Sequence, residues 1–193
     1  KFLKSQYHPH FLFNALNTVY FQIDESNKAP RRTLEMISEL LRYQLYGGNQ
    51  KVSILQEIDY LKTYIALRKL RMSERLRLRV EFPPELNELN IYPLLFLPLV
   101  ENAFKYVGGD YQLDIIMKWE NNRISLFIRN SIPELSAEDE ALRKSVDERQ
   151  RKGIGLVNLR RRLSLLYPNK HRLETRKEET EFVAELMIEI EDI

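Results

Sequence analysis

The sequence predicts an α+β fold in which a helical hairpin precedes a mainly antiparallel sheet with its helices on one face. Three observations lead to this prediction. Apolar residues recur at helical spacing before Gly47, and they alternate at every second residue in several later segments. The chain also has only six glycines, which stand in three pairs, at 47–48, at 108–109, and at 153 with 155. We expect these pairs to mark structural breaks, because glycine tolerates backbone angles that other residues avoid.

The first unit is predicted to be a pair of amphipathic helices. Apolar residues at helical spacing run from Leu12 to Ile23 and again from Leu34 to Leu45. A polar stretch separates them, and its Pro30 suits the first turn of the second helix. Two helices of this length cannot bury their apolar faces alone, so residues 1–50 are expected to form a four-helix bundle with a second copy.

The second unit, residues 51–193, is predicted to begin with a helix. Ser53 and Gln56 have the spacing of a capping box, and a helical stripe of apolar residues follows over 54–70. Further along, the apolar stretch 93–107 predicts a buried helix, with a proline at each possible start, Pro93 and Pro98, and the second glycine pair at its end.

Strands and a last helix complete the second unit. The segments with two-residue alternation are 77–82, 112–119, 123–130, 171–177 and 181–190. Asn121-Asn122 is typical of a hairpin turn, and Pro168 ends a predicted helix over 154–167. The charged, aperiodic residues 131–152 predict a loop.

Composition excludes several classes of function. The chain of 193 residues has no cysteine, so it has neither disulfides nor a thiolate site. The net charge of +2 is too balanced to favour direct nucleic-acid binding, and no apolar run reaches the roughly 18 residues of a membrane span. Because the chain begins at Lys1 without a signal sequence, we expect it to be part of a longer protein.

The first segment that predicts chemistry surrounds His10. Pro9 disfavours helical geometry at the residue before it, so a helix must start or kink just before His10. The imidazole would then stand beside an irregular turn, where a second domain could reach it, and neutral imidazole is a good nucleophile near pH 7. The alternative is a surface histidine without chemistry.

Two further segments predict a phosphate site. Within an apolar helix, Asn102 offers an oxygen suited to Mg²⁺, and Lys105 on the same helix face could meet a phosphate. Gly153 and Gly155 precede a helix whose free N–H groups would suit phosphate. The alternatives are that the first group is merely the wet edge of its helix, and that the glycines mark an ordinary helix start.

Together, in this order, these segments resemble the LytS/YehU-type sensor histidine kinases. The residues that fit the phosphoacceptor motif are Gln6, Pro9 to Asn14, Leu16 and Asn17, with Arg42-Tyr43 in the second helix. Residues 98–103 with Lys105 resemble the N box, and the residues that resemble the G2 box are Gly153 to Leu156, Asn158, Arg160, Arg162 and Leu163. The resemblance implies a phosphoacceptor hairpin followed by a Bergerat-type (GHKL) ATP-binding α/β sandwich.

The resemblance also implies roles for individual residues. His10 would be the phosphorylated residue, Asn14 one turn along could orient its ring, and Asn102 would bind Mg²⁺. The nucleotide-binding residues would be Glu101, Asn102, Lys105, Tyr106, Asn130, Gly153, Ile154, Gly155 and Leu156. Residues 131–152 would be the ATP lid. The family's Asp-x-Gly-x-Gly segment is absent, and Asn130 stands where its adenine-binding acid would be, which removes charge from that contact.

The predicted function is therefore ATP-dependent autophosphorylation of His10, followed by transfer to an aspartate of a response regulator. The protein would be a homodimer, and this chain would be the cytoplasmic portion of a membrane sensor whose membrane segment lies upstream. One alternative is a degenerate kinase fold that signals as a non-catalytic dimeric module. A second is a GHKL ATP hydrolase, although Pro98 stands where such enzymes place their water-activating glutamate.

Overall fold

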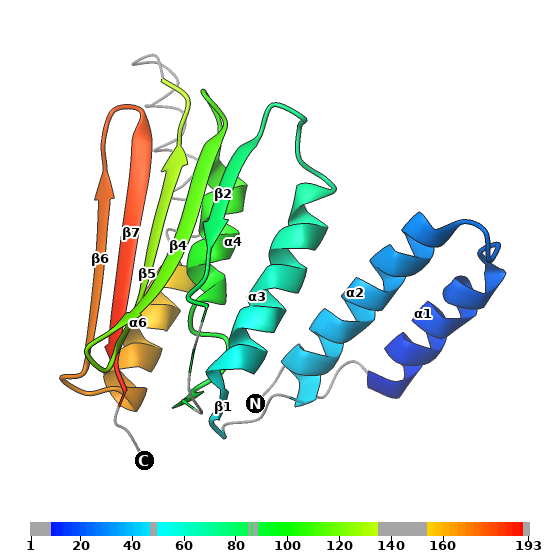
Figure 1. Cartoon of the computed structure of the whole chain (residues 1–193), viewed down its shortest axis with the longest axis horizontal. Coiled ribbons are helices and arrows are strands. Elements are labelled where there is room, and N and C mark those ends of the chain that lie inside the picture. Colours follow the sequence, from blue (N-terminus) through cyan, green and yellow to red (C-terminus); the bar gives the residue numbers. More distant parts are fainter. Residues whose placement is uncertain (1–8, 47–49, 85, 87–88, 135–153, 191–193) are drawn as a thin grey trace.

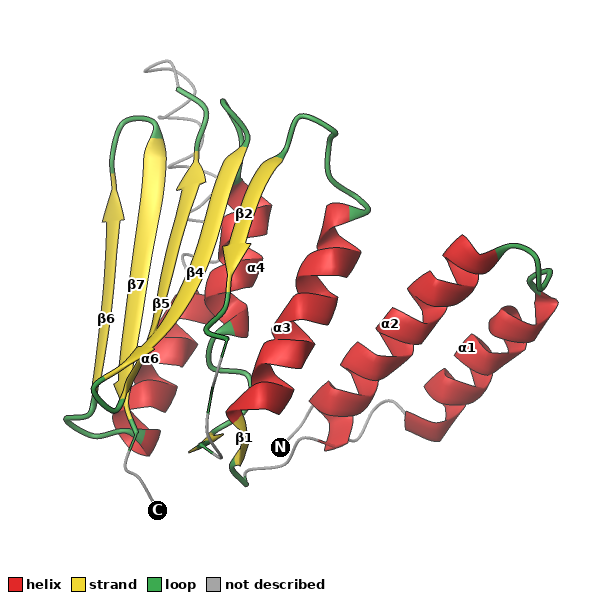
Figure 2. Ribbon diagram, in the orientation of Figure 1, coloured by secondary structure: helices red, strands yellow, loops and turns green. Residues whose placement is uncertain are grey.

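A computed structural model gives the arrangement of the helices and the sheet. The residues that it describes are 9–46, 50–84, 86, 89–134 and 154–190. Figure 1 shows a helical hairpin at one end of the molecule, a third helix beside it, and then a five-stranded sheet. Helices α3, α4 and α6 lie on the same side of this sheet, so the predicted α+β architecture is confirmed (Figure 2).

The hairpin consists of α1 (Pro9–Gln22) and α2 (Lys28–Tyr46), which confirms both predicted helices. Asp24 stabilises the turn between them by accepting hydrogen bonds from the backbone N–H of Ser26, at 2.8 Å, and from its hydroxyl. None of the residues of α1 is buried, whereas α2 buries Met36 and Leu40.

Helix α3 (Ile54–Lys69) begins as its sequence predicts. The Ser53 hydroxyl accepts from the backbone N–H of Gln56, and the Gln56 side chain accepts from the backbone N–H of Ser53, which completes the capping box. The apolar stripe is buried at Ile54, Ile58, Leu61 and Ile65, whereas Tyr64 is half-buried and Leu70, the C-cap residue, is 63% exposed. The predicted stripe therefore extends one residue past the end of the helix.

Helix α4 (Leu97–Tyr106) begins at the second of its two candidate prolines. Pro98 lies in its first turn. The prediction allowed a start at Pro93, but Leu94 has a φ of 60°, which is incompatible with a right-handed helix. The residues between 93 and 97 form a buried loop, in which Leu95 and Phe96 are fully buried.

The main sheet has the strand order β2-β4-β5-β7-β6. Its strands are β2 (Arg77–Glu81), β4 (Gln112–Glu120), β5 (Arg123–Ser131), β6 (His171–Lys177) and β7 (Glu181–Glu189). Only the β2–β4 pair is parallel among them. The predicted turn between β4 and β5 is confirmed, since Asn121 and Asn122 have φ of 51° and 59°.

A second, two-stranded sheet of β1 (Val52–Ser53) and β3 (Asn90–Ile91) was missed from the sequence, because two residues are too few to show alternation. Helix α6 (Ile154–Leu166) closes the layer of helices as predicted. The apolar core lies between these helices and the sheet, where residues such as Leu113, Ile115, Ile124 and Leu163 are fully buried.

The predicted loop over 131–152 begins later than expected. Ser131 is the last residue of β5, and the backbone N–H of Ile132 still donates to the carbonyl of Thr180, at 2.8 Å. The main-chain pairing therefore extends past the strand. Residues 135–152 of the predicted lid lie outside the described residues.

Candidate functional site

His10 occupies the first turn of α1, directly after Pro9, as the sequence predicts. Its ring is exposed, and its Nδ1 lies 3.1 Å from the amide Nδ2 of Asn14, one turn along the helix. In this orientation the amide donates to Nδ1. An amide turned by 180° would instead present its oxygen to an Nδ1–H group. Asn14 is therefore placed to orient the ring and to select its tautomer.

His10 is separated from the other predicted site residues. Helix α1 packs against α2, and α2 packs against α3, so α2 stands between α1 and the layer of helices on the sheet (Figure 1). The remaining candidates lie on α4, β5 and α6. The structure thus divides the predicted site into a part on α1, with His10, and a part on α4, β5 and α6.

Helix α4 presents the predicted N-box residues at its solvent edge. The helix buries Leu99, Val100, Ala103 and Phe104, while Glu101, Lys105 and Tyr106 are exposed and Asn102 is half-buried. Among the described residues, the side chain of Asn102 has no hydrogen-bond partner. The Lys105 ammonium stands 4.9 Å from the centre of the Tyr106 ring.

Glu101 points toward α3. Partial burial raises the pKa of its carboxyl, although the positive charge of Arg68 opposes this effect. Burial raises the pKa of Tyr60 and Tyr64 on α3, and the Glu101 charge adds to this effect. Glu101 therefore lies on the side of α4 that faces α3. Because successive residues of a helix are rotated by about 100°, Asn102 points in a different direction.

Asn130 is fully buried near the end of β5. Its Nδ2 donates to the carbonyl of Ser131 at 3.3 Å, but its Oδ1 has no hydrogen-bond partner among the described residues. A buried acceptor without a donor is costly, so native structures rarely keep one. The free oxygen would suit the adenine amino group that the family resemblance implies for this position.

The strand end beside Asn130 is packed closely against the loop that follows α4. A Cβ on Gly108 would lie 2.9 Å from Cδ of Pro133, and a Cβ on Gly109 would lie 2.9 Å from the carbonyl oxygen of Ile132. The Ser131 hydroxyl also donates to the Gly108 carbonyl at 2.6 Å. The glycine pair therefore also leaves room for Ile132 and Pro133, which follow β5 where the family pattern has glycines.

Helix α6 carries the predicted G2 residues. Gly155 lies in its first turn, where an added Cβ would meet nothing within 4 Å, and Leu156 packs against the core. Ile154 is the first residue of the helix, and Gly153 lies outside the described residues. The predicted glycine turn therefore lies only partly within the described residues, but the predicted helix from Ile154 is confirmed.

One buried polar residue was missed from the sequence. Glu57 on α3 is fully buried and accepts from the Tyr43 hydroxyl at 2.7 Å. Its position was a usable signal, because it lies three residues after Ile54 and four before Leu61 and so falls on the apolar face of α3.

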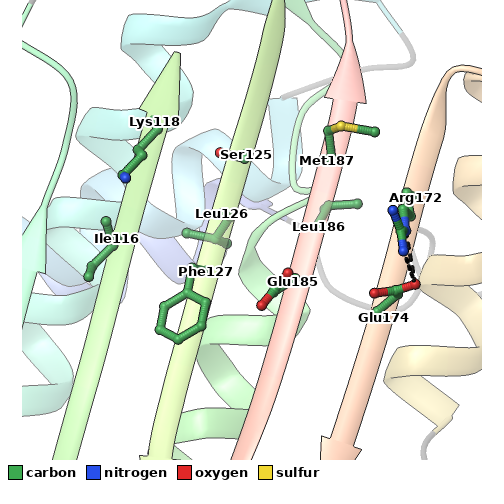
Figure 3. Close-up of a pocket in the computed structure, with 10 residues that line it drawn as sticks. All are labelled: Ile116, Lys118, Ser125, Leu126, Phe127, Arg172, Glu174, Glu185, Leu186 and Met187. Carbon is green, nitrogen blue, oxygen red and sulfur yellow. Dashed lines mark hydrogen bonds and ion pairs between the residues drawn. The ribbon is translucent and has the colours of Figure 1, made fainter. Parts of the chain in front are cut away.

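A shallow groove lies on the face of the sheet that carries no helix (Figure 3). Phe127 and Met187 line it together with the Arg172–Glu174 ion pair, whose nearest atoms are 2.7 Å apart. No predicted site residue lines this groove. The helix-bearing face therefore remains the candidate nucleotide site.

The residues present fit a nucleotide and a magnesium ion. Asn130 offers a buried acceptor, and the Asn102 amide oxygen is of the kind that Mg²⁺ prefers. Within the described ranges, no three His, Asp or Glu side chains gather into a metal-binding cluster, so Asn102 would share the ion with phosphate oxygens and water. No helix in those ranges is long and apolar enough to cross a membrane.

Comparison with known proteins identifies relatives. The histidine kinase family model matches residues 1–76, which include His10. The sensor protein kinase HptS of Staphylococcus aureus is 29% identical over 178 residues, which cover 90% of this chain and 34% of HptS. The chain thus spans about a third of that relative's length. Full-length ShkA, solved in complex with AMPPNP, has the same fold, with 13% identity and a TM-score of 0.52, over 94% of this chain and 44% of ShkA.

Proposed function

We propose that this chain, a homologue of the sensor histidine kinases, is the phosphoacceptor and ATP-binding part of a kinase of the LytS/YehU type. Residues 1–50 would form the dimeric phosphoacceptor unit and residues 51–193 the nucleotide-binding unit. The phosphoryl group would pass from His10 to an aspartate of a response regulator. The chain would be the cytoplasmic portion of a sensor that reaches the membrane through an upstream segment.

The single observation that carries the proposal is the pairing of His10 with Asn14. The Asn14 amide contacts Nδ1, so Nε2 is the ring nitrogen that remains accessible for attack on the terminal phosphorus of ATP. In the orientation shown the amide Nδ2 donates to Nδ1, so the reaction requires the amide turned by 180°, with its oxygen accepting from Nδ1–H and the lone pair of Nε2 free. An N–P bond then forms, the P–O bond to ADP breaks, and the ring loses its Nδ1 proton to solvent when the phosphorylated imidazole returns to neutrality.

The second part of the site would hold the nucleotide. Asn130 would accept from the adenine amino group, Lys105 would neutralise phosphate charge, and the N–H groups of residues 153–156 would bind the phosphates. Glu101 and Tyr106 flank the same helix edge. Mg²⁺ held by Asn102 would neutralise the charge that develops on the phosphate oxygens. The AMPPNP complex of ShkA supports ATP as the ligand of this fold.

The separation of His10 from these groups sets the requirement for the reaction. The hairpin must move, or a partner's hairpin must present its histidine, before the imidazole meets the phosphate (Figure 1). The same separation, with the uncharged Asn130, favours a second candidate, a non-catalytic dimeric signalling module. Calorimetric titration with AMPPNP distinguishes them, since only the second candidate predicts no heat at millimolar nucleotide.

The test of the proposed function is incubation of the chain with γ-labelled ATP and Mg²⁺. We expect label on the protein that is stable to alkali and lost in acid, as an N–P bond requires, and no label on His10→Gln. His171→Gln is the matched control and should retain the label, because His171 lies on β6, where its Nδ1 bonds the Tyr167 carbonyl at 2.7 Å. Label that persists in His10→Gln contradicts the assignment.

A further inference from the structure

The buried carboxylate of Glu57 joins the hairpin to the loop that precedes α4. Its Oε2 accepts from the Tyr43 hydroxyl of α2 at 2.7 Å. The same oxygen accepts from the backbone N–H of Leu94 at 3.0 Å. One oxygen atom therefore connects a residue of the phosphoacceptor hairpin with the segment that leads into the N-box helix.

Leu94 depends on this connection. Its φ of 60° lies in the left-handed region, which is costly for a residue with a branched side chain. Its N–H is held by Glu57, and its carbonyl accepts from the guanidinium of Arg162 on α6 at 3.4 Å. The position of α4 relative to α3 and α6 is thus fixed through a strained residue whose two backbone polar groups are both bound by side chains.

The electrostatics of Glu57 make the Tyr43 hydrogen bond consequential. Burial raises the pKa of the Glu57 carboxyl, while the Tyr43 hydroxyl, the Leu94 N–H, the charge of Arg162 and the Leu95 N–H favour the ionised form. Its second oxygen, Oε1, makes no hydrogen bond of good geometry among the described residues. A buried carboxylate is destabilised strongly when one of its donors is removed.

Two further contacts from the Tyr43 turn of α2 hold the hairpin on α3. The Tyr43 and Tyr60 rings stack with centroids 4.6 Å apart, and the Gln44 amide donates to the Tyr60 hydroxyl at 2.6 Å. Stacking and hydrogen bonds specify one docking geometry more sharply than apolar burial does. Displacement of the hairpin would break these contacts and the Tyr43–Glu57 bond together.

We propose that Glu57 is a positioning residue that couples docking of the hairpin to the geometry of α4, and through α4 to the nucleotide site. This inference rests on the proposed function for its last step. With the hairpin docked, Tyr43 and Leu94 share the Glu57 carboxylate and the loop before α4 is held. With the hairpin displaced, the carboxylate loses its hydroxyl donor, and the loop is free to rearrange with Asn102 behind it.

The test compares the full chain with its Tyr43→Phe variant. Because the chain has no cysteine, spin labels can be placed at Glu39→Cys on α2 and Glu120→Cys on β4, both exposed. We expect Tyr43→Phe to broaden the distance distribution between the labels, to speed hydrogen exchange at the Leu94–Phe96 amides, and to change the dissociation constant for AMPPNP by at least about fivefold.

Tyr20→Phe is the matched control, because it removes a tyrosine–glutamate hydrogen bond of 3.1 Å within the hairpin. It should change none of the three measurements. Glu57→Gln keeps a neutral acceptor for Leu94 and should give an intermediate effect. If Tyr43→Phe lowers the melting temperature but leaves label distance and Leu94 exchange unchanged, the residue is merely structural and the inference fails. If exchange and distance change but no variant binds nucleotide, the coupling stands and the proposed function fails.

Discussion

At the scale of single residues, the buried side chain of Asn130 is the feature that most directly favours a bound nucleotide. Its Oδ1 is buried with no partner among the described residues, so the protein bears a desolvation cost there that a donor from a ligand would offset. The adenine amino group is such a donor. An aspartate would form a stronger bond, but it would also place an unpaired charge in a fully buried position whenever the nucleotide is absent.

Asn130→Leu tests this interpretation. The substitution removes a buried unsatisfied Oδ1 at the cost of one long hydrogen bond to the Ser131 carbonyl, so the free energy of unfolding should stay nearly unchanged. AMPPNP binding should weaken by about 1–3 kcal/mol, measured by calorimetry, since the adenine donor loses its acceptor. Inorganic triphosphate, which has no base, is the matched ligand and should bind both proteins equally. Equal weakening for the two ligands would place Asn130 away from the base.

At the scale of elements, the loop between α4 and β4 packs closely on the residues that follow β5. The glycines lie in that loop rather than after β5, and Gly108 and Gly109 leave room for Ile132 and Pro133. Gly109 also has a φ of 59°, which residues with a Cβ rarely adopt. Gly155, by contrast, is in a helix with open space around it.

Gly109→Ala and Gly155→Ala should therefore have opposite effects on stability. We expect Gly109→Ala to destabilise the fold by about 1–3 kcal/mol, because the backbone of Ile132 cannot withdraw as a flexible side chain could. Gly155→Ala should be stabilising by up to about 1 kcal/mol, because alanine restricts the unfolded chain. Urea unfolding measures both changes. If the phosphates approach the backbone at Gly155, the second variant should also lose AMPPNP affinity while gaining stability.

The elements with local signals could be predicted from the sequence. The capping box at Ser53, the Asn121-Asn122 turn and the start of α1 after Pro9 each depend on residues within a few positions of one another. The start of α4 could not, because the choice between two prolines depends on Leu94, whose backbone is held by Glu57 and Arg162, 37 and 68 residues away.

The candidate site follows the same division. The residue types and order of its motifs were evident, but the buried Asn130 oxygen and the Gly109–Ile132 contact appear only when distant segments are brought together. The separation of His10 from α4 and α6 had no signal in the sequence at all, since it depends on how the hairpin docks through Tyr43 and Gln44.

At the scale of the whole molecule, α1 is incompletely covered. Phe13 and Tyr20 face the hairpin partner, where Phe13 stacks on Tyr46 with ring centroids 6.3 Å apart and Tyr20 bonds Glu35. Val19 and Phe21 are 46% and 78% exposed. At 100° per residue they lie on opposite flanks of α1, about 100° to either side of Tyr20, and a second copy of the chain is the simplest way to cover such a flank.

If a second copy covers this flank of α1, Phe21→Glu should weaken the dimer. A charge within an apolar helix interface loses buried area and must be desolvated, so the dimer dissociation constant should rise by at least about tenfold. Sedimentation velocity over a range of protein concentrations measures it. Leu165→Glu on α6 is the matched control, because Leu165 is an apolar residue that is 73% exposed but lies on α6 rather than on the hairpin. It should leave the dimer intact. A parent chain that sediments as a monomer at every concentration would mean that α1 is covered by something other than a second copy, and presentation of His10 by a partner would then be excluded for this chain.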